Sequence, residues 1–209
     1  MIKSEKITIF FGNSGTGKSS LLNTKVTCLL EKENYFPIRV RFTGGLDKSD
    51  VTTPVQIIQK ELELVIEQYK ESQSIIFDSV KPKLWEYIKL IERSFQKNKI
   101  YDCGIVLVFD QFEEFFYFPV NEQTEFTKQI AELVHDWPPK RILDWVNGLN
   151  EANITPEILD WHKQPEVRVI LAVRSDKLSM LDAMVKVLPK VLRSRYELKT
   201  FREENAILA

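Results

Sequence analysis

A stretch of five apolar or β-branched residues, Ile7 to Phe11, runs directly into a glycine-rich loop and constrains the fold of this chain more than any other feature. The loop reads Gly-Asn-Ser-Gly-Thr-Gly-Lys-Ser over residues 12–19, which is the pattern G-x-x-x-x-G-K-S. Residues 20–23, Ser-Leu-Leu-Asn, read as the start of a helix. Because a strand, a glycine loop and a helix in this order are the context in which this motif binds phosphate, we expect the loop to wrap around a phosphate group.

The residue types in the loop suit that chemistry. Glycine has no Cβ and tolerates positive φ, so successive backbone N–H groups can converge on an anion. We expect Lys18 to reach the β- and γ-phosphates of a nucleotide and Ser19 to offer its hydroxyl to Mg²⁺. The helix that follows points its positive N-terminal end at the same anion. The predicted nucleotide-binding residues are Gly12, Asn13, Ser14, Gly15, Thr16, Gly17, Lys18, Ser19 and Ser20.

A second apolar run, Ile105 to Phe109, is uninterrupted and ends in Asp110. Such a run is typical of a strand that is buried on both faces in the middle of a parallel sheet. Ligands of open α/β sheets bind at the carboxyl ends of the strands. We therefore expect Asp110 to hold Mg²⁺ together with Ser19, directly or through water, against the nucleotide at the glycine loop.

Two carboxylates follow at Glu113 and Glu114, within the run Asp-Gln-Phe-Glu-Glu of residues 110–114. Their position suits polarisation of a water molecule that attacks the γ-phosphate, so we predict a catalytic role for at least one of them. The alternative is that both acids only begin the next helix, where negative charge favours the positive end of the helix dipole.

The run Val167 to Val173 predicts another strand, which ends at Arg174. An arginine at the carboxyl end of a strand beside the glycine loop can contact the γ-phosphate and report its presence. The alternative is a surface arginine that caps a helix or pairs with Asp176. We favour the first interpretation and predict that Arg174 belongs to the catalytic site.

The remaining elements follow from hydrophobic periodicity and from helix start and stop signals. Residues 36–42 are predicted to form a strand at or near a sheet edge, because Pro37, Arg39 and Arg41 alternate with apolar residues. A capping box is expected at Thr53. Further predictions are helices at 20–33, 54–69, 79–95, 122–134, 141–147, after Thr155, at 178–188 and at 201–209, a loop at 44–50 and a short strand at 195–198.

Composition limits the class of protein. The chain has 209 residues, 44% of them hydrophobic, which suffices for the core of one α/β domain. Its 29 Lys and Arg balance 30 Asp and Glu, so the net charge of -1 gives no support for nucleic acid binding. The polar N-terminus lacks a signal peptide, and no apolar run is long enough to cross a membrane, so we expect a cytoplasmic protein. Cys28 and Cys103 are expected to be core thiols.

Three motifs together resemble the STAND ATPases, the signal-transduction ATPases with numerous domains, and within them the novel STAND NTPases. The motifs are the glycine loop at 12–19, the Asp-Gln-Phe-Glu-Glu run at 110–114 and Val-Arg-Ser-Asp at 173–176. The resemblance extends from the first strand to Leu198. It implies that Asp110 is the Mg²⁺ acid, that Glu113 and Glu114 are an acidic pair associated with hydrolysis, and that Arg174 is a sensor arginine.

The resemblance also implies a fold and a function. The implied fold is α/β, a P-loop NTPase three-layer αβα sandwich whose mainly parallel five-stranded sheet has the additional-strand order 5-1-4-3-2. The implied function is a switch that is closed with ADP and opens on exchange for ATP, with Mg²⁺ as the metal. The implied partners are effector and sensor domains of a longer signalling or defence protein, which forms a nucleotide-dependent homo-oligomer. We expect residues 1–209 to be a fragment of such a protein, monomeric by itself, with weak nucleotide affinity and slow ATP hydrolysis.

Two other functions would share the glycine loop. A P-loop kinase that phosphorylates a small molecule offers no reason for the Asp-Gln-Phe-Glu-Glu run, and a non-catalytic scaffold would use bound nucleotide only for structure. A GTPase is less well supported, because the guanine-reading pattern Asn-Lys-x-Asp is missing. Hydrolysis with water as the only acceptor distinguishes an ATPase switch from the kinase and the scaffold.

Overall fold

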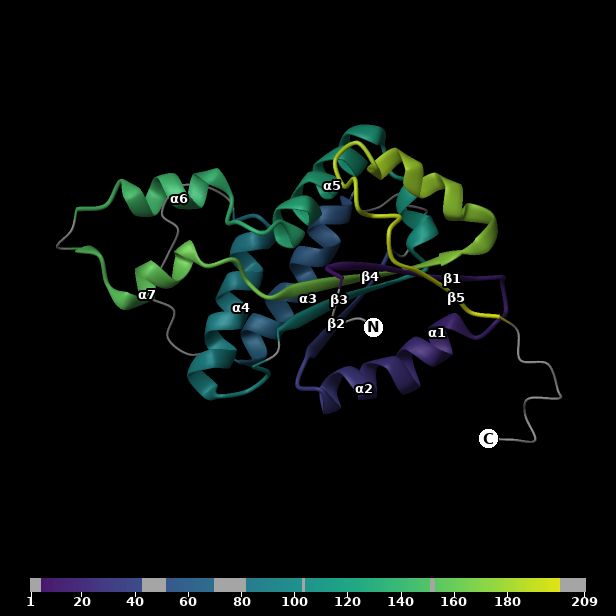
Figure 1. Ribbon diagram of the computed structural model, residues 1–209, viewed down its shortest axis with the longest axis horizontal. Coiled ribbons are helices and arrows are strands. Elements are labelled where there is room, and N and C mark those ends of the chain that lie inside the picture. The colour runs from purple at the N-terminus through teal and green to yellow at the C-terminus, as the bar shows by residue number, and fades with distance from the viewer. Residues whose placement is uncertain (1–4, 43–51, 70–81, 103, 151–152, 200–209) are drawn as a thin grey trace.

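The computed structural model describes residues 5–42, 52–69, 82–102, 104–150 and 153–199. A five-stranded sheet, parallel throughout, has the strand order β2-β3-β4-β1-β5. Helices cover both faces of this sheet (Figure 1). The three-layer αβα sandwich and the strand order predicted from the sequence are thereby confirmed. The strands are β1 (Ile7–Gly12), β2 (Phe36–Arg41), β3 (Ile105–Asp110), β4 (Val167–Arg174) and β5 (Arg195–Glu197).

The helices divide between the two faces of the sheet (Figure 1). One face carries a single helical stretch made of α1 (Lys18–Leu21), the π-helical η1 (Leu22–Val26) and α2 (Thr27–Lys32). The other face carries α3 (Pro54–Gln68), α4 (Leu84–Asn98) and α5 (Val120–Val134). The shorter segments are η2 (Phe112–Tyr117), α6 (Lys140–Asn147), α7 (Pro156–Leu159), η4 (Asp160–His162) and η5 (Ser175–Met184).

Strand β3, which lies between β2 and β4, is buried along its whole length, as its uninterrupted apolar sequence predicts. Successive side chains of a strand point to opposite faces, so β3 contributes to two cores. Ile105, Leu107 and Phe109 lie in the large core under α3, α4 and α5. Val106 and Val108 lie in the smaller core with residues of the first helical stretch. The strand that carries Asp110 is therefore fixed from both sides.

Local sequence signals set several element boundaries. Thr53 and Gln56 form the predicted capping box, in which Thr53 N donates to Gln56 Oε1 at 2.8 Å and Gln56 N donates to Thr53 Oγ1 at 3.2 Å. At the start of α7, Thr155 Oγ1 accepts from Ile158 N at 3.3 Å. Strand β2 lies at the sheet edge, as its alternation of proline and arginine with apolar residues predicts. No helix among the described residues is long and apolar enough to cross a bilayer.

Three predictions differ from the structure. Helix α4 begins at Leu84 and not near residue 79, because Lys83 is extended and forms the N-cap, with its N–H donating to Glu86 Oε2 at 3.1 Å. The predicted helix at 178–188 is the 3₁₀ segment η5 followed by turns, and its apolar residues Leu178, Leu181 and Met184 repeat at the 3₁₀ period of three. Cys28 is exposed, so it is not a core thiol. The loop at 44–50, Cys103 and the helix at 201–209 lie outside the described residues.

Candidate nucleotide-binding site

The parallel topology brings the predicted site residues to one edge of the sheet. In the register of β1 and β4, Gly12 lies beside Arg174. In the register of β2 and β3, Arg41 lies beside Asp110. Since the carboxyl ends of parallel strands meet at the same edge, the glycine loop, the acid and the arginine converge although they are far apart in the sequence.

The glycine loop has the backbone conformation that phosphate binding requires. Gly15 and Gly17 have φ of 76° and 81°, in the left-handed region that favours glycine. No atom lies within 4 Å of the place that a Cβ would take at either residue, so the loop is open on this side. The hydroxyl of Thr16 donates to Asn13 O at 2.8 Å and braces the turn. Among the described residues, the N–H groups of Gly15 and Gly17 have no backbone partner and are available to an anion.

The side chain of Lys18 folds back onto the backbone of the glycine loop. Its ammonium donates to the carbonyl oxygens of Gly12 at 2.7 Å and Asn13 at 2.8 Å. Burial lowers the pKa of Lys18, the carboxylate of Glu113 acts in the opposite direction, and the guanidinium of Arg174 lowers the pKa further. A phosphate oxygen at this position would supply the negative charge that offsets the burial of the ammonium.

Ser19 and Asp110 form the candidate metal site. The Ser19 hydroxyl donates to Asp110 Oδ1 at 2.8 Å. The second carboxylate oxygen, Asp110 Oδ2, is buried without a hydrogen-bond partner, and its nearest cation is Arg39 Nη2 at 3.7 Å. A buried carboxylate oxygen without a donor, beside a hydroxyl, fits Mg²⁺, which prefers hard oxygen ligands. The two residues predicted to hold the metal are therefore in contact.

Gln111 sets the direction of the chain after β3, and no sequence motif had singled it out as a site residue. It has φ of 55°, a left-handed conformation that is uncommon for residues other than glycine. Arg41 Nε donates to its side-chain oxygen at 2.7 Å. The turn buries Phe112 and Phe115 in the core, and the phenylalanine rings stack with centroids 4.9 Å apart. With these rings fixed, Glu113 at the start of η2 lines the same pocket as the glycine loop.

The two glutamates of η2 have different surroundings. Glu113 lines the same pocket as Lys18 and accepts a hydrogen bond from the backbone N–H of Arg174 at 3.3 Å. Glu114 is not among the residues that line this pocket. The sequence motif does not distinguish the two acids, and the difference in their surroundings arises from the turn at Gln111.

Arg174 lines the pocket, but its guanidinium is bonded to Asp176. Nε donates to Oδ1 and Nη2 donates to Oδ2 of that carboxylate, both at 3.0 Å. The observed ion pair with Asp176 is the one named as the alternative interpretation of Arg174 in the sequence analysis. About half of each side chain is exposed, so this ion pair is screened by solvent and weak.

Together these residues line a pocket of about 280 Å³, which we call the nucleotide pocket. Most of the predicted site residues line it, and Gln111 is an addition. Gly12, Asn13 and Thr16 do not line it but support Lys18 and the loop through their hydrogen bonds. The lining residues are Ser14, Gly15, Gly17, Lys18, Ser19, Ser20, Asp110, Gln111, Glu113 and Arg174.

A glycine loop between a parallel strand and a helix, with its serine bonded to an acid at the end of the buried strand β3, defines the class of the protein as a P-loop NTPase domain. Comparison with protein families specifies it further. The chain belongs to the family Novel STAND NTPase 1, whose model matches residues 1–208. The resemblance found in the three sequence motifs is thereby confirmed.

A solved structure of low sequence identity shows the same fold. The Walker-type ATPase PABY2304 of Pyrococcus abyssi matches with a TM-score of 0.54 and 13% identity over 99% of this chain and 52% of that chain. Cdc6p from Pyrobaculum aerophilum matches with a TM-score of 0.46 and 12% identity over 97% of this chain and 42% of its own. The chain thus spans about half the length of these two proteins or less. A comparison with curated protein sequences gives no match.

Proposed function

We propose that this chain is the ATP-binding and ATP-hydrolysing switch domain of a multidomain STAND protein with a signalling or defence role. The observation that carries the proposal is the hydrogen bond of 2.8 Å between Ser19 and Asp110, which joins the glycine loop to the acid at the end of β3. It combines a phosphate cradle and a hard-cation site in one pocket. A nucleoside triphosphate bound with Mg²⁺ requires both.

In this proposal the glycine loop binds the phosphates. The N–H groups of Gly15 and Gly17 donate to phosphate oxygens, and the Lys18 ammonium exchanges its carbonyl partners for the β- and γ-phosphates. Ser19 Oγ and Asp110 Oδ2 would hold Mg²⁺, which when bound neutralises charge on the phosphates. Binding would thereby give a partner to each of the unsatisfied groups described above.

Glu113 is the residue we propose to act on the attacking water. Its Oε2 is held by the Arg174 N–H at 3.3 Å, so the carboxylate has a fixed place in the nucleotide pocket. There it accepts a hydrogen bond from a water molecule and takes its proton as the oxygen attacks the γ-phosphorus. The bond between the γ-phosphorus and the β–γ bridging oxygen breaks, and ADP and phosphate leave. Arg174 would contact the γ-phosphate once its guanidinium leaves Asp176.

The partners of the switch are also proposed, on the basis of membership in the STAND family. We assign to the longer protein effector and sensor domains, a homo-oligomer that forms when ATP replaces ADP, and a cytoplasmic location. The contribution of this chain to that protein is the nucleotide-dependent step.

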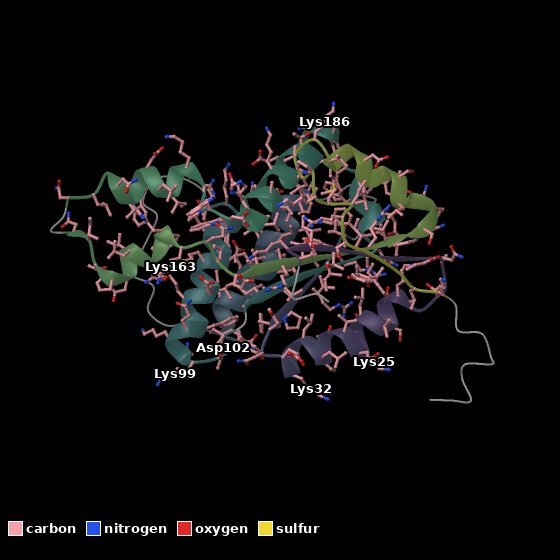
Figure 2. The ribbon with its side chains drawn as sticks, in the orientation of Figure 1. Lys25, Lys32, Lys99, Asp102, Lys163 and Lys186 are labelled. Atoms are coloured by element: carbon pink, nitrogen blue, oxygen red, sulfur yellow. The ribbon has the colours of Figure 1, made fainter. Side chains whose placement is uncertain are left out.

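The test compares the parent chain with Lys18→Ala in calorimetry with Mg²⁺-ATP and in release of phosphate with water as the only acceptor. We expect the parent to bind ATP and release phosphate slowly. Loss of a charge-assisted hydrogen bond is worth roughly 1.5–3 kcal/mol, so the variant should bind about tenfold to hundredfold more weakly while its melting temperature is unchanged. Lys25→Ala is the matched control, since Lys25 is an exposed lysine of η1 that lies at the surface (Figure 2).

Each other outcome contradicts a part of the proposal. Equal ATP affinity in the parent and in Lys18→Ala would show that the glycine loop does not bind phosphate. Binding without phosphate release would favour the non-catalytic scaffold. Phosphate transfer that requires a second substrate would favour the small-molecule kinase.

A further inference from the structure

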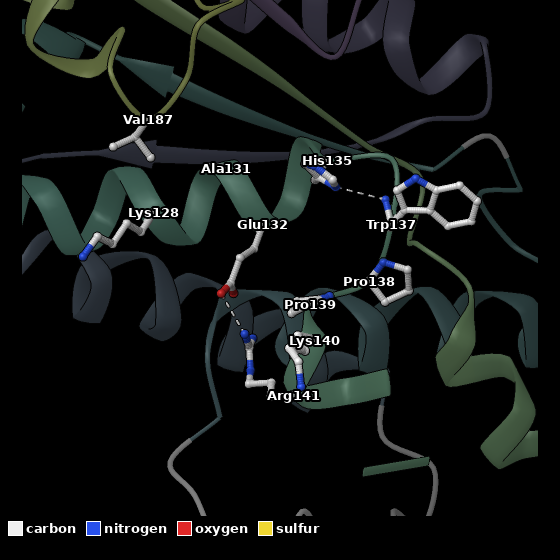
Figure 3. Close-up of a pocket in the computed structure, with 10 residues that line it drawn as sticks. All are labelled: Lys128, Ala131, Glu132, His135, Trp137, Pro138, Pro139, Lys140, Arg141 and Val187. Atoms are coloured by element: carbon white, nitrogen blue, oxygen red, sulfur yellow. Dashed lines mark hydrogen bonds and ion pairs between the residues drawn. The ribbon is translucent and has the colours of Figure 1, made fainter. Parts of the chain in front are cut away.

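A second pocket, of about 530 Å³, lies at the carboxyl-terminal end of α5 and shares no residue with the nucleotide pocket (Figure 3). We call it the Trp137 pocket. Its walls come from the last turns of α5, the Trp-Pro-Pro linker of residues 137–139, the start of α6, and Val187. The residues that line it are Lys128, Ala131, Glu132, His135, Trp137, Pro138, Pro139, Lys140, Arg141 and Val187. Nothing in the nucleotide chemistry above uses any of these residues.

The floor of the Trp137 pocket is a fixed network of charges. Arg141 donates to Glu132 Oε1 at 2.8 Å and to both oxygens of the buried Glu86 at 2.7 and 3.0 Å. Burial by itself lowers the pKa of Arg141, but the hydrogen bonds and charges of Glu86 and Glu132 outweigh it and raise that pKa. Because this network joins α6 to α4 and α5, the pocket exists before any ligand arrives.

The rim of the pocket exposes a large aromatic side chain. Trp137 is 70% exposed, whereas Trp85 and Trp161 are completely buried, and Trp145 packs against Trp161 with ring centroids 5.8 Å apart. Pro138 and Pro139 follow directly and limit the conformations of the rim, since proline fixes φ. A tryptophan beside a concave apolar surface is a feature that dominates the energy of many protein interfaces.

The rim of the pocket carries two exposed lysines, Lys128 and Lys140. Arg141 is outnumbered by its two carboxylate partners, Glu86 and Glu132, so it offers no positive charge to a ligand. Lys128 is exposed and has no ion pair or hydrogen bond within the part of the chain that the structure describes. Lys140 pairs with Asp144 at 2.6 Å, but both side chains are well exposed, and such surface pairs exchange partners at little cost. In Figure 3, Lys128 and Trp137 lie at opposite ends of the pocket.

From these observations we propose that the Trp137 pocket binds an acidic peptide segment of a partner protein, which inserts one bulky apolar side chain beside Trp137 and places carboxylates near Lys128 and Lys140. The apolar wall and the exposed tryptophan suit the side chain, and the two lysines select for negative charge. Two lysines are too few to bind a nucleic acid backbone or an anionic membrane. The concave shape suits a side chain that inserts, which a peptide provides.

The test uses a defined probe, a fluorescein-labelled peptide of eight residues in which a Phe-Leu pair is flanked on each side by two acidic residues. Two comparison peptides replace the acids by lysine or the Phe-Leu pair by Gly-Ser. We expect saturable binding of the first peptide in fluorescence anisotropy, at least about tenfold weaker binding of both comparison peptides, and weakening by salt. In ¹⁵N spectra the indole N–H signal of Trp137 should shift on titration with the first peptide.

Variants of the protein locate the binding. Trp137→Ser and Lys128→Glu should each weaken the acidic peptide about tenfold, with melting temperature and ATP affinity unchanged because both side chains are exposed. Tyr117→Ser and Lys32→Glu are matched controls and should bind as the parent does, since Tyr117 is also 70% exposed and Lys32 lies at the surface on α2 (Figure 2).

Several results would overturn the proposal. They are equal binding of the acidic and basic peptides, no binding at millimolar peptide, or undiminished binding by both Trp137→Ser and Lys128→Glu. A shift of the Trp137 signal that depends on the concentration of the protein alone would show that a second copy of the chain fills the pocket, and this too would contradict a peptide site. None of these results depends on whether the chain hydrolyses ATP.

Discussion

At the residue scale, the conformation of Gln111 decides which acid reaches the nucleotide pocket. Its left-handed backbone, with φ of 55°, turns the chain away from β3, and Arg41 holds its side chain from the edge strand. Glu113 is thereby brought to the Arg174 N–H and to the neighbourhood of Lys18, while Glu114 stays outside the lining of the pocket. The geometry gives the two acids different surroundings.

We therefore expect Glu113→Gln to slow phosphate release by about 10²–10⁴-fold, the range for loss of a general base. Glu114→Gln, which removes the same charge from the next residue, should change the rate by less than about threefold. ATP affinity should stay within a few-fold of the parent in both variants, since the phosphate cradle is untouched. The rates are measured as phosphate release at saturating Mg²⁺-ATP. A larger loss in Glu114→Gln than in Glu113→Gln would contradict the assignment.

A second prediction at this scale concerns Asp176, which occupies the guanidinium of Arg174 through two hydrogen bonds of 3.0 Å. If Arg174 contacts the γ-phosphate, Asp176 competes with it. Exposed ion pairs are worth about 0.2–1 kcal/mol, so Asp176→Asn should raise ATP affinity about two- to fivefold and leave ADP affinity unchanged. Calorimetry with both nucleotides measures the difference, and Asp182→Asn, which alters another exposed carboxylate of η5, is the control. An equal rise for ADP would show that Asp176 acts only through net charge.

At the scale of elements, the start of β3 depends on Gly104. Its φ is 108°, and a Cβ there would lie 2.3 Å from the carbonyl oxygen of Glu166. The same segment is held by two backbone hydrogen bonds of 2.9 Å, from Phe36 N to Gly104 O and from Ile105 N to Glu166 O. A side chain at this position would push apart the starts of β2, β3 and β4.

Gly104→Ala should therefore lower the free energy of unfolding by about 2 kcal/mol or more, since backbone strain and a steric clash add. Gly148→Ala provides the comparison, because Gly148 has φ of −83° at the end of α6 and should change stability by less than about 1 kcal/mol. Urea unfolding followed by circular dichroism measures both. Equal stability of the two variants would show that the starts of these strands are free to adjust.

Elements whose signals are local were predictable from the sequence, and those that depend on tertiary contacts were not. For the strand β3, the glycine loop and the capping box at Thr53, a segment of a few residues is enough to predict the local structure. Two details of the helices were predicted wrongly, because the general helical pattern was given more weight than local signals. For α4 the local signal was the N-cap at Lys83, and for η5 it was the spacing of three between apolar residues. Cys28 was wrongly predicted to be buried, because the average burial of cysteine does not indicate which side of a helix a particular cysteine occupies.

The same division applies to the candidate site. The residues of the glycine loop, Asp110 and Arg174 follow from motifs, and parallel topology brings them together at one edge. Gln111 and Arg39 were not predicted as site residues, because their positions depend on the pairing of β2 with β3. The only signal for Arg39 was its alternation with apolar residues on an edge strand. That pattern indicates exposure, and it does not indicate a contact with Asp110.

At the scale of the whole molecule, the nucleotide pocket and the Trp137 pocket differ in the chemistry of their linings. The nucleotide pocket at the carboxyl edge of the sheet is lined by polar and charged residues and glycine. The Trp137 pocket has apolar walls and lies at the carboxyl-terminal end of α5, whereas η2 precedes the amino-terminal end of this helix. Helix α5 spans Val120–Val134 and connects the segment of Glu113 to the rim that carries Trp137. A rigid helix of this kind gives the two pockets a common support, although each is testable by itself.

The composition of the nucleotide pocket leads to the last prediction, which concerns the base of the nucleotide. Among its ten lining residues in the described part of the chain, none has an aromatic or aliphatic side chain on which a purine could stack. Base stacking on an aromatic side chain is worth about 1–3 kcal/mol, and no such contribution is available here. We therefore expect the chain of 209 residues to bind ATP weakly and to bind GTP within about threefold of ATP. We also expect it to be a monomer in solution. Calorimetry with both nucleotides and light scattering provide the measurements. A preference for ATP of tenfold or more would show that residues outside the lining of this pocket bind adenine.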